Sequence, residues 1–512
     1  MPAVHVEVER KFDAPTDFVL PDLAGVDGVA GVEAPEERQL EAVYHDTADL
    51  RLARARVTMR RRTGGPDAGW HVKLPETAGA RRELHFPLGR AGRTPPKAVQ
   101  APVLGIVRSA TVGPVATLQT RRLVTLLRGD DGRVLAEVAD DTVTGTALAA
   151  TPDQPATVQV WRELEVELVD GDDALLAAVA ERLVAAGARP SPSPSKLARV
   201  LGDRLAALDG RATDAGTKKT PAGEVVLAAL AAQVQALQDA DLLVRTGRPD
   251  GVHDLRVACR RLRSILAAYR PVLDRERTEP LRDELRWVGT ELSAARDGQV
   301  ALAHLRELAA AQPDELLVGP VIARLQQAEV KDAEAGRRAA DRTLSDARYR
   351  QLLDDLHALL DDPPFGDRAA DPARRVLARA IERSGERLRR RIAAARDERA
   401  SGSLHEVRKA AKRVRYTAEV AAPVLGRRAA DLVERMEDVQ DVLGERQDTV
   451  VTRDWCRRLG MAASAAGENG WTFGRLHALE EARAAAAEAE FWRSEPALRK
   501  AVRTAVRQAA KS

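Results

Sequence analysis

Two carboxylates and one ammonium group alternate close to the start of the chain. Glu7, Glu9 and Lys11 fill every second position of a segment, residues 4–12, in which polar and apolar side chains alternate. In a β-strand such positions share one face. Carboxylate oxygens hold Mg²⁺ or Mn²⁺, and an ammonium group binds phosphate oxygens. For this motif alone, a solvated face of an amphipathic strand is the competing interpretation.

Further charged residues stand on one face of other expected strands in the first part of the chain. They are Arg60, Arg62, Lys73, Arg81, Glu83, Arg122, Glu163, Glu165 and Glu167. If the apolar faces of these strands pack outward, the charged faces line a hydrated tunnel. Acidic clusters beside Arg and Lys suit a chain of phosphates with divalent cations as the ligand.

The elements that carry these residues are predicted to be short antiparallel strands. Alternating segments are separated by Gly and Pro turns, which favours an antiparallel sheet or barrel. The expected strands span residues 4–12, 57–62, 70–74, 118–127, 134–143 and 158–169. Asp130-Asp131-Gly132 marks a hairpin, and a helix is expected over about residues 172–186. The alternation leaves open whether Asp140 or Asp141 faces inward.

A basic motif occurs twice in the second part of the chain, which has helical periodicity. In each copy a histidine and three cations share one side of a helix, and apolar residues occupy the other side. The two sets are His253, Arg256, Arg260 and Arg263, and His405, Arg408, Lys412 and Arg415. A second matching segment follows each copy, at Arg296-Asp297 and at Arg446-Gln447-Asp448. The repeat predicts a duplicated helical bundle with an approximate two-fold relation.

A linear polyanion is the ligand that these rows of cations predict. Few carboxylates follow at helical spacing to neutralise them, and the rows on two helices can follow evenly spaced phosphates. A solvated cationic stripe is the structural alternative. Nucleic acid is disfavoured because only 3% of the residues are aromatic and no helix-turn-helix, RRM or zinc-finger pattern occurs. A linear polyanion without bases needs no stacking platform and is favoured over nucleic acid.

Length and composition set the remaining limits. A chain of 512 residues allows two or more domains. We expect a tunnel domain at 1–205, a linker at 206–222 and an all-α domain at 223–512. The isolated Cys259 and Cys456 exclude a disulfide framework and a cysteine-rich zinc site. The lack of long apolar runs disfavours membrane spans and a secretory signal. The two isolated thiols make a reducing cytoplasm the expected location.

The N-terminal residues resemble the CYTH family, the triphosphate tunnel metalloenzymes. The resemblance covers residues 1–205 and rests on Glu7-x-Glu9-x-Lys11, Tyr44-His45-Asp46-Thr47, Arg60 to Arg62, Trp70 to Lys73 and Glu163-x-Glu165-x-Glu167. It implies an α+β protein with an eight-stranded antiparallel tunnel that hydrolyses inorganic triphosphate or a related triphosphate with Mg²⁺ or Mn²⁺.

This resemblance also implies roles for individual residues. The metal ligands would be Glu7, Glu9, Glu163, Glu165 and Glu167. The phosphate-binding residues would be Lys11, Arg60, Arg62, Lys73, Arg81, Arg122 and Lys196. The catalytic set would be Glu7, Glu9 and Lys11.

The helical part, about residues 223–510, resembles the CHAD family, the conserved-histidine α-helical domain. Both histidine motifs and the segments that follow them carry the match. The resemblance implies a two-fold pseudosymmetric bundle that binds inorganic polyphosphate through the eight motif residues named above. The combined expectation is a metal-dependent triphosphatase joined to a polyphosphate-binding domain. A non-catalytic polyphosphate-binding or targeting protein is the second hypothesis, and an adenylate cyclase is the third.

Overall fold

The structure is a computed structural model that describes residues 3–76, 81–89, 94–149, 155–208, 220–398 and 401–511. The side chains at 4, 6, 294–297, 401, 501–502 and 505–511 lie outside this description. The chain divides into two compact units, Met1–Ala212 and Thr213–Ser512. Much of the expected linker, residues 209–219, and the side chains of Arg296 and Asp297 lie outside the described residues, so the domain limits stay a prediction.

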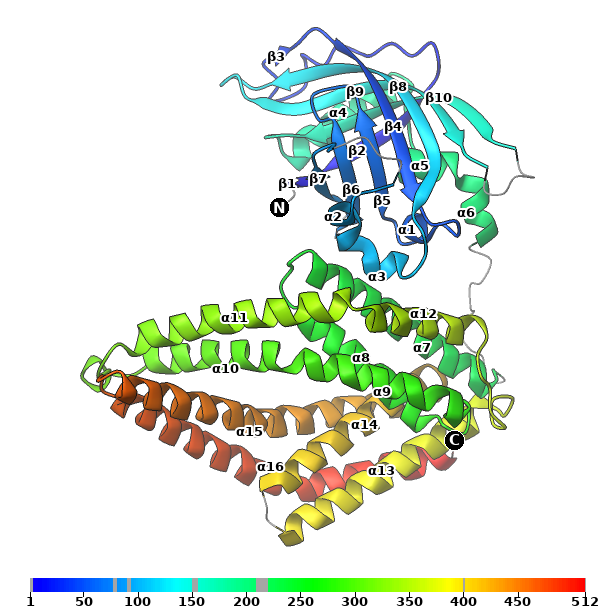
Figure 1. Ribbon diagram of the computed structural model, residues 1–512. Helices are drawn as coiled ribbons and strands as arrows, with labels where there is room; N and C mark the ends of the chain where they lie inside the picture. The colour runs from blue at the N-terminus through cyan, green and yellow to red at the C-terminus, as the bar shows by residue number, and fades with distance from the viewer. Residues whose placement is uncertain are drawn as a thin grey trace. The chain divides into compact units, whose positions relative to one another are not determined.

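One antiparallel sheet of eleven strands dominates the first unit, and the second unit is helical, which confirms the predicted fold class (Figure 1). The strands are β1 Ala3–Glu7, β2 Glu9–Ala14, β3 Gly31–Val32, β4 Glu36–Asp46, β5 Thr58–Thr63, β6 Gly69–Pro75, β7 Arg81–Phe86, β8 Gly113–Arg128, β9 Val134–Ala147, β10 Thr157–Leu168 and β11 Arg189–Pro190. Their order is β1-β7-β6-β5-β4-β8-β9-β10-β2-β11, and β3 pairs with β8. Gly132 has a φ of 77° in the β8–β9 hairpin, a conformation that favours glycine.

The sheet closes on its own first strand. Only Val8 separates β1 from β2, and β1 pairs with β7 while β2 pairs with β10. The backbone N–H of Leu168 donates to the Val8 carbonyl at 3.0 Å, so the pairing with β10 continues to the break. When β1 and β2 are counted as one strand and the two-residue strands β3 and β11 are set aside, the eight long strands of the expected tunnel remain.

Apolar side chains cover the outside of this sheet. Val179 and Leu183 of α4 pack with Leu164 and Val166 of β10. Because successive strand residues point to opposite faces, this packing turns the glutamates between them inward. The helices of the unit are α1 Arg51–Arg54, α2 Lys97–Gln100, α3 Leu104–Val107, α4 Asp173–Ala185, α5 Lys196–Val200 and α6 Gly202–Leu208, with a 3-10 turn at Ala101–Val103.

The part of the second unit that the structure describes forms ten α-helices and one 3-10 turn (Figure 1). The helices are α7 Ala222–Arg245, α8 Gly251–Ala268, α9 Arg275–Glu291, α10 Ser293–Ala310, α11 Val321–Ser345, α12 Ala347–Asp361, α13 Ala373–Glu398, α14 Ser401–Leu425, α15 Arg427–Ala465 and α16 Trp471–Lys511, and the turn is Asp314–Leu316. Within these described residues, no helix combines the length and apolar character that crossing a membrane requires.

The two copies of the basic motif lie on α8 and α14, which share one hydrophobic core. Leu255 and Leu262 of α8 and Val407 and Val414 of α14 are buried in it. The Tyr269 hydroxyl, just beyond α8, donates to a backbone carbonyl of α14 at 2.9 Å. Burial of these apolar stripes leaves the motif cations on the other side of each helix.

Candidate functional site

Charged side chains line a cavity of about 340 Å³ inside the closed sheet. They come from β1, β2 and β4 to β10, and from the segment that begins α5. The tunnel residues predicted from the sequence all line this cavity except Glu163. They are joined by Arg38, Tyr44, Thr58, Asp67 and Glu137.

Lys196 lies among three carboxylates at one side of the tunnel. Ser195 caps α5, since its hydroxyl accepts a backbone N–H of the first turn at 3.1 Å. The Lys196 Nζ then lies 2.6 Å from Glu163, 2.7 Å from Glu165 and 3.0 Å from Asp141. Burial alone lowers the pKa of Lys196, but these carboxylates raise it above its ordinary value. The three carboxylates lie within 4.8 Å of one another, a spacing that suits a cation.

Glu165 also joins two other predicted phosphate-binding residues. Lys11 Nζ lies 2.5 Å and an Arg122 nitrogen 2.6 Å from its carboxylate. Burial alone raises the pKa of Glu165, but Lys11 and the neighbouring cations hold it well below its usual range. This part of the tunnel therefore combines fixed positive charge with ionised carboxylates.

The orientation of the two aspartates on β9 follows from their partners. Asp141 faces the tunnel and accepts two hydrogen bonds from Arg122, at 2.8 and 2.7 Å. Asp140 faces the other side, where Arg162 lies 2.7 Å away. Glu137 has the same alternation as Asp141, so it also points inward. Glu137 was not among the predicted site residues, although the alternation of residues 134–143 places it on the same face as Asp141.

A row of carboxylates crosses three neighbouring strands. Glu167 is in register with Glu9 of β2 on one side and with Glu137 of β9 on the other. Burial first, and then Glu7 and Glu9, raise the pKa of Glu167 to about 7. Local cations therefore offset only part of the negative charge, and the oxygen donors suit a hard divalent cation such as Mg²⁺ or Mn²⁺.

Lys73 of β6 contacts carboxylates of two other strands, β1 and β7. Its Nζ lies 2.5 Å from Glu7 and 3.2 Å from Glu83. The Nδ1 atom of His71 contacts the Glu83 carboxylate, and its Nε2 atom lies 2.9 Å from the Asp67 carbonyl. These contacts hold the ammonium group of Lys73 inside the cavity.

Arginines accumulate on the strands between these walls. Arg38 and Arg122 are direct neighbours in the β4–β8 register. Burial first, and then Arg60 and Arg122, lower the pKa of Arg62 to about 9, although Arg62 contacts Asp67. Such mutual repulsion indicates a place for an anion with several charges. Arg81, the remaining predicted cation, lines the cavity and donates to the Pro194 carbonyl at 2.6 Å.

Four motif cations of the helical unit influence one another across α8 and α14. Burial first, and then Arg260, Arg408 and Arg256, lower the pKa of Lys412 to about 7, while Asp448 opposes the shift. Arg408 packs over Gly444 of α15, where an added Cβ would lie 3.2 Å from the guanidinium. The fold therefore brings together the charges of two motifs that are far apart in the sequence.

Three other residues of the two motifs, His253, His405 and Arg415, lie in surroundings that differ from one another. His253 is exposed, and His405 Nδ1 lies 2.8 Å from the Gln447 side-chain oxygen. Gln447 separates Arg446 from Asp448 in the second copy of the repeat, whereas Arg296 and Asp297 are adjacent in the first copy. Arg415 is 2.9 Å from Glu419 and 2.6 Å from Glu437.

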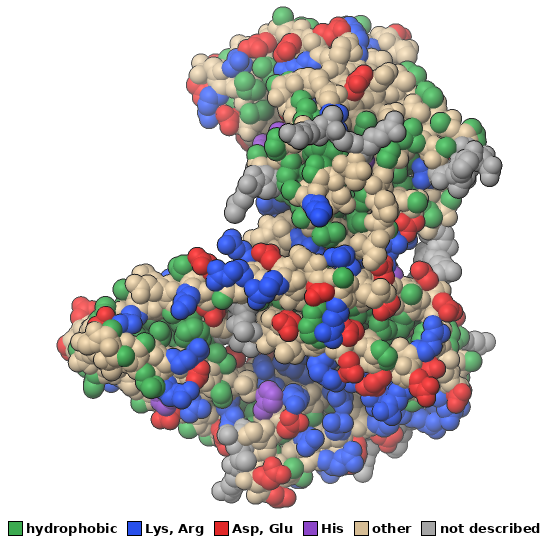
Figure 2. Space-filling view, viewed as in Figure 1, with side chains coloured by type: hydrophobic (Ala, Val, Ile, Leu, Met, Phe, Trp, Pro, Cys, Tyr) green, Lys and Arg blue, Asp and Glu red, His purple; other side chains and the backbone are tan. Residues whose placement is uncertain are grey.

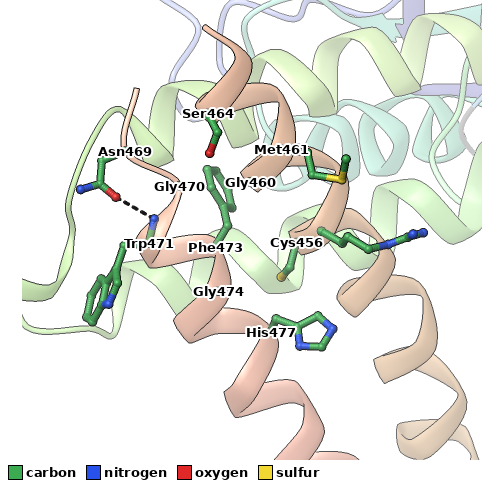
Figure 3. Close-up of a pocket in the computed structure, with 11 residues that line it drawn as sticks. Cys456, Gly460, Met461, Ser464, Asn469, Gly470, Trp471, Phe473, Gly474 and His477 are labelled. Atoms are coloured by element: carbon green, nitrogen blue, oxygen red, sulfur yellow. Dashed lines mark hydrogen bonds between the residues drawn. The ribbon is translucent and has the colours of Figure 1, made fainter. Parts of the chain in front are cut away.

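A cavity of about 680 Å³ lies elsewhere in the helical unit, between α15 and α16 (Figure 3). Phe473 and Met461 line it together with several glycines, and Arg457 is its one Lys or Arg among the described residues. The backbone N–H of Trp471 donates to the side-chain oxygen of Asn469 at 2.8 Å across the turn that enters α16. This lining suits an apolar contact and offers little to a polyanion.

Comparisons with known proteins identify both units. A CYTH domain model matches residues 5–200, and a CHAD domain model matches residues 228–457. The uncharacterised protein MT2285 of Mycobacterium tuberculosis (strain CDC 1551 / Oshkosh) is 37% identical over 495 residues, which cover 94% of this chain and 93% of that protein. PptA from Streptomyces chartreusis is 19% identical, with 57% of this chain and 100% of that chain covered and a TM-score of 0.44. The CHAD domain from the plant Ricinus communis is 24% identical, with 57% and 94% covered and a TM-score of 0.42.

Proposed function

Because the chain belongs to the family in which a CYTH domain precedes a CHAD domain, we propose that it is a metal-dependent triphosphatase joined to a polyphosphate-binding domain. The observation that carries the proposal is the cavity of about 340 Å³ in which carboxylates and Arg and Lys side chains converge. Inorganic triphosphate, or a related triphosphate, matches this lining in charge. Binding of polyphosphate would associate the protein with polyphosphate granules in the cytoplasm.

The carboxylates of the tunnel would hold the metal ion. The proposed ligands are Glu7, Glu9, Glu163, Glu165 and Glu167, with Glu137 as an addition from the register of β9 and β10. The raised pKa of Glu167 supports this assignment, because crowded carboxylates gain from a bound cation. A bound Mg²⁺ or Mn²⁺ would polarise phosphate oxygens and lower the pKa of a water molecule.

The cations of the tunnel would hold the triphosphate. Lys11, Lys73 and Arg122 each contact carboxylates in the structure, and phosphate oxygens can replace part of those contacts. Guanidinium groups bind phosphate through two parallel hydrogen bonds and offset the charge that develops on the transferred phosphoryl group. Arg60, Arg62, Arg81 and Lys196 complete the proposed phosphate-binding set.

Release of phosphate from inorganic triphosphate in the presence of Mg²⁺ or Mn²⁺ tests the proposal directly. Polyphosphate binding without any phosphate release from a triphosphate panel would favour the second hypothesis, a non-catalytic binding or targeting protein. Formation of cyclic AMP from ATP would instead support the cyclase hypothesis.

The two aspartates on β9 provide a matched pair of variants. We expect Asp141→Asn to lower triphosphate turnover by about tenfold or more, because it weakens the contacts that orient Arg122 and Lys196. Asp140→Asn makes the same chemical change on the outer side of the strand, and its turnover should stay near that of the parent. Steady-state phosphate release from both variants is the measurement. Equal losses of turnover in the two variants would contradict the proposal that Asp141 orients Arg122 and Lys196 in the tunnel.

The helical unit would bind polyphosphate through the motif residues of α8 and α14. Titration of Lys412 would make this binding depend on pH. Because its pKa is lowered to about 7, Lys412 is charged below that value and loses its charge above it. We therefore expect the affinity for polyphosphate to fall several-fold between pH 6 and pH 8. Lys412→Arg keeps a positive charge at both pH values, and both motif histidines remain in it as in the parent. Its affinity for polyphosphate should therefore fall less over this pH range. An identical pH profile in the parent and in Lys412→Arg would exclude Lys412 as the cause.

A further inference from the structure

A second group of arginines continues from the motif cations at the C-terminal end of α8. Its members lie on or next to α8, α9, α13 and α14, and we name them the Arg413 patch: Arg263, Arg270, Arg282, Arg286, Arg387 and Arg413. Arg263 belongs to the predicted binding residues, and Arg413 stands beside one of them in the second motif. The others lie outside both motifs. Figure 2 shows Lys and Arg side chains gathered on the helical unit, in the lower part of the view.

Contacts between helices bring the Arg413 patch together. The Arg282 Nε donates to the Arg263 carbonyl at 3.4 Å, which joins α9 to α8. Burial first, and then Arg387 and Arg282, lower the pKa of the half-buried Arg413. Burial, Arg286 and Arg282 have the same effect on Arg263, whose buried Nε has no hydrogen-bond partner among the described residues.

Few carboxylates neutralise this patch. Glu279 contacts Arg282 and lies 3.0 Å from Arg270, and Asp283 lies 2.8 Å from Arg286. Of the residues that the structure describes, none places a carboxylate oxygen within 4.0 Å of the remaining three arginines of the patch. The patch therefore keeps a positive surplus that an external anion can offset.

The end of the repeat that corresponds to this patch has a different charge. Arg415 occupies the position in the second copy that Arg263 has in the first, and Arg261 corresponds in the same way to Arg413. Yet Arg415 pairs with Glu419 and Glu437, at 2.9 and 2.6 Å, and Arg261 lies 3.4 Å from Glu419. The two copies therefore match in sequence, but Arg263 and Arg413 lack the carboxylate partners that Arg415 and Arg261 have among the described residues.

We propose that the Arg413 patch is a further binding site for a long polyphosphate chain. The chain would bind the motif cations of α8 and α14 and continue from them onto the Arg413 patch, not toward Arg415. The proposal rests on the proposed polyphosphate binding of this unit. A chain with one negative charge per phosphate follows uncompensated cations and avoids the carboxylates beside Arg415. Chains too short to cover both groups of cations gain nothing from the patch, so the site selects long chains.

The test compares two charge-matched double variants of the full-length protein, in buffer without divalent ions. Arg286→Glu with Arg387→Glu alters two exposed members of the patch on α9 and α13. Arg277→Glu with Arg389→Glu alters two exposed arginines on the same helices outside it. We expect the first variant to lose about tenfold in affinity for long-chain polyphosphate, with a salt slope smaller by about one for each lost contact. Its affinity for inorganic triphosphate should stay within about twofold of that of the parent, because the short triphosphate chain does not contact the patch.

A second comparison tests the direction of the chain. Arg413→Gln and Arg415→Gln remove one charge each from α14, and we expect the larger loss for Arg413→Gln. Equal losses from these two variants, or equal losses from the two double variants, would overturn the proposal. A parent protein that binds no long-chain polyphosphate would instead reject the proposed function itself, so the two failures are distinguishable.

Discussion

In the Glu9→Gln variant we expect metal-dependent phosphate release from inorganic triphosphate to fall by about a hundredfold or more, as when a key group of an active site is removed. The substitution nearly preserves the shape of the side chain but removes a negative oxygen donor from the row formed by Glu9, Glu167 and Glu137. Polyphosphate binding by the helical unit should be unchanged. The measurement is phosphate release at saturating Mg²⁺ and Mn²⁺.

Glu41→Gln is the matched control for this prediction. Glu41 is exposed on β4 and does not line the tunnel cavity, so the same loss of one carboxylate charge should leave turnover near that of the parent. Near-parental turnover in Glu9→Gln would reject the assignment of Glu9 as a metal ligand.

Simultaneous reversal of Arg256 and Arg408 should lower the affinity for long-chain polyphosphate by about a hundredfold or more, because each reversal replaces an attractive contact with a repulsive one. Both arginines act on the pKa of Lys412, so they belong to one group of cations on α8 and α14. Either reversal alone should weaken binding and leave some affinity, since each motif supplies only part of the surface. Titration at several salt concentrations should also give a smaller salt slope.

Arg338→Glu provides the control for the reversal. Arg338 is exposed on α11 and pairs with Glu334 at 3.4 Å, outside both motifs. Its reversal should cost little affinity. Circular dichroism should report unchanged helical content in the double variant, whereas a loss of helix would indicate that these arginines hold the bundle together.

Alternation along the strands predicted much of the tunnel. A period of two placed Glu7, Glu9 and Lys11 on one face, and packing of the intervening apolar residues fixed which face is inside. The strand β4 was missed because its first half, Glu36–Gln39, carries four polar residues in succession and is largely solvent-exposed. Arg38 lines the cavity only because β4 pairs with β8, a neighbour distant in the sequence.

The helical unit was predictable where one helix carries the whole pattern. The spacing of each motif predicted α8 and α14 with one cationic side. On α13, Arg387 follows Arg375, Arg379 and Arg383 at four-residue intervals, a cationic row that was not among the predicted binding residues. No pattern within one helix shows that Arg282 and Arg387 approach Arg413, because that approach comes from tertiary packing. One acidic partner of Arg415 was hidden in the same way, because Glu437 lies on α15 and comes close only in the folded bundle.

Closure of the sheet at Val8 has a consequence for the order of folding. Glu7 and Glu9 leave the ribosome early, but the β10 residues that complete their row are synthesised after nearly all of the other strands. β1 can pair with β7 before β10 is made, but β2 must wait for β10, and contacts between distant parts of a chain form slowly because a long loop has to close. Until then, a nascent chain has an open sheet edge, and the carboxylates of the proposed metal site are not yet together. Activity should thus emerge with ring closure rather than accumulate strand by strand.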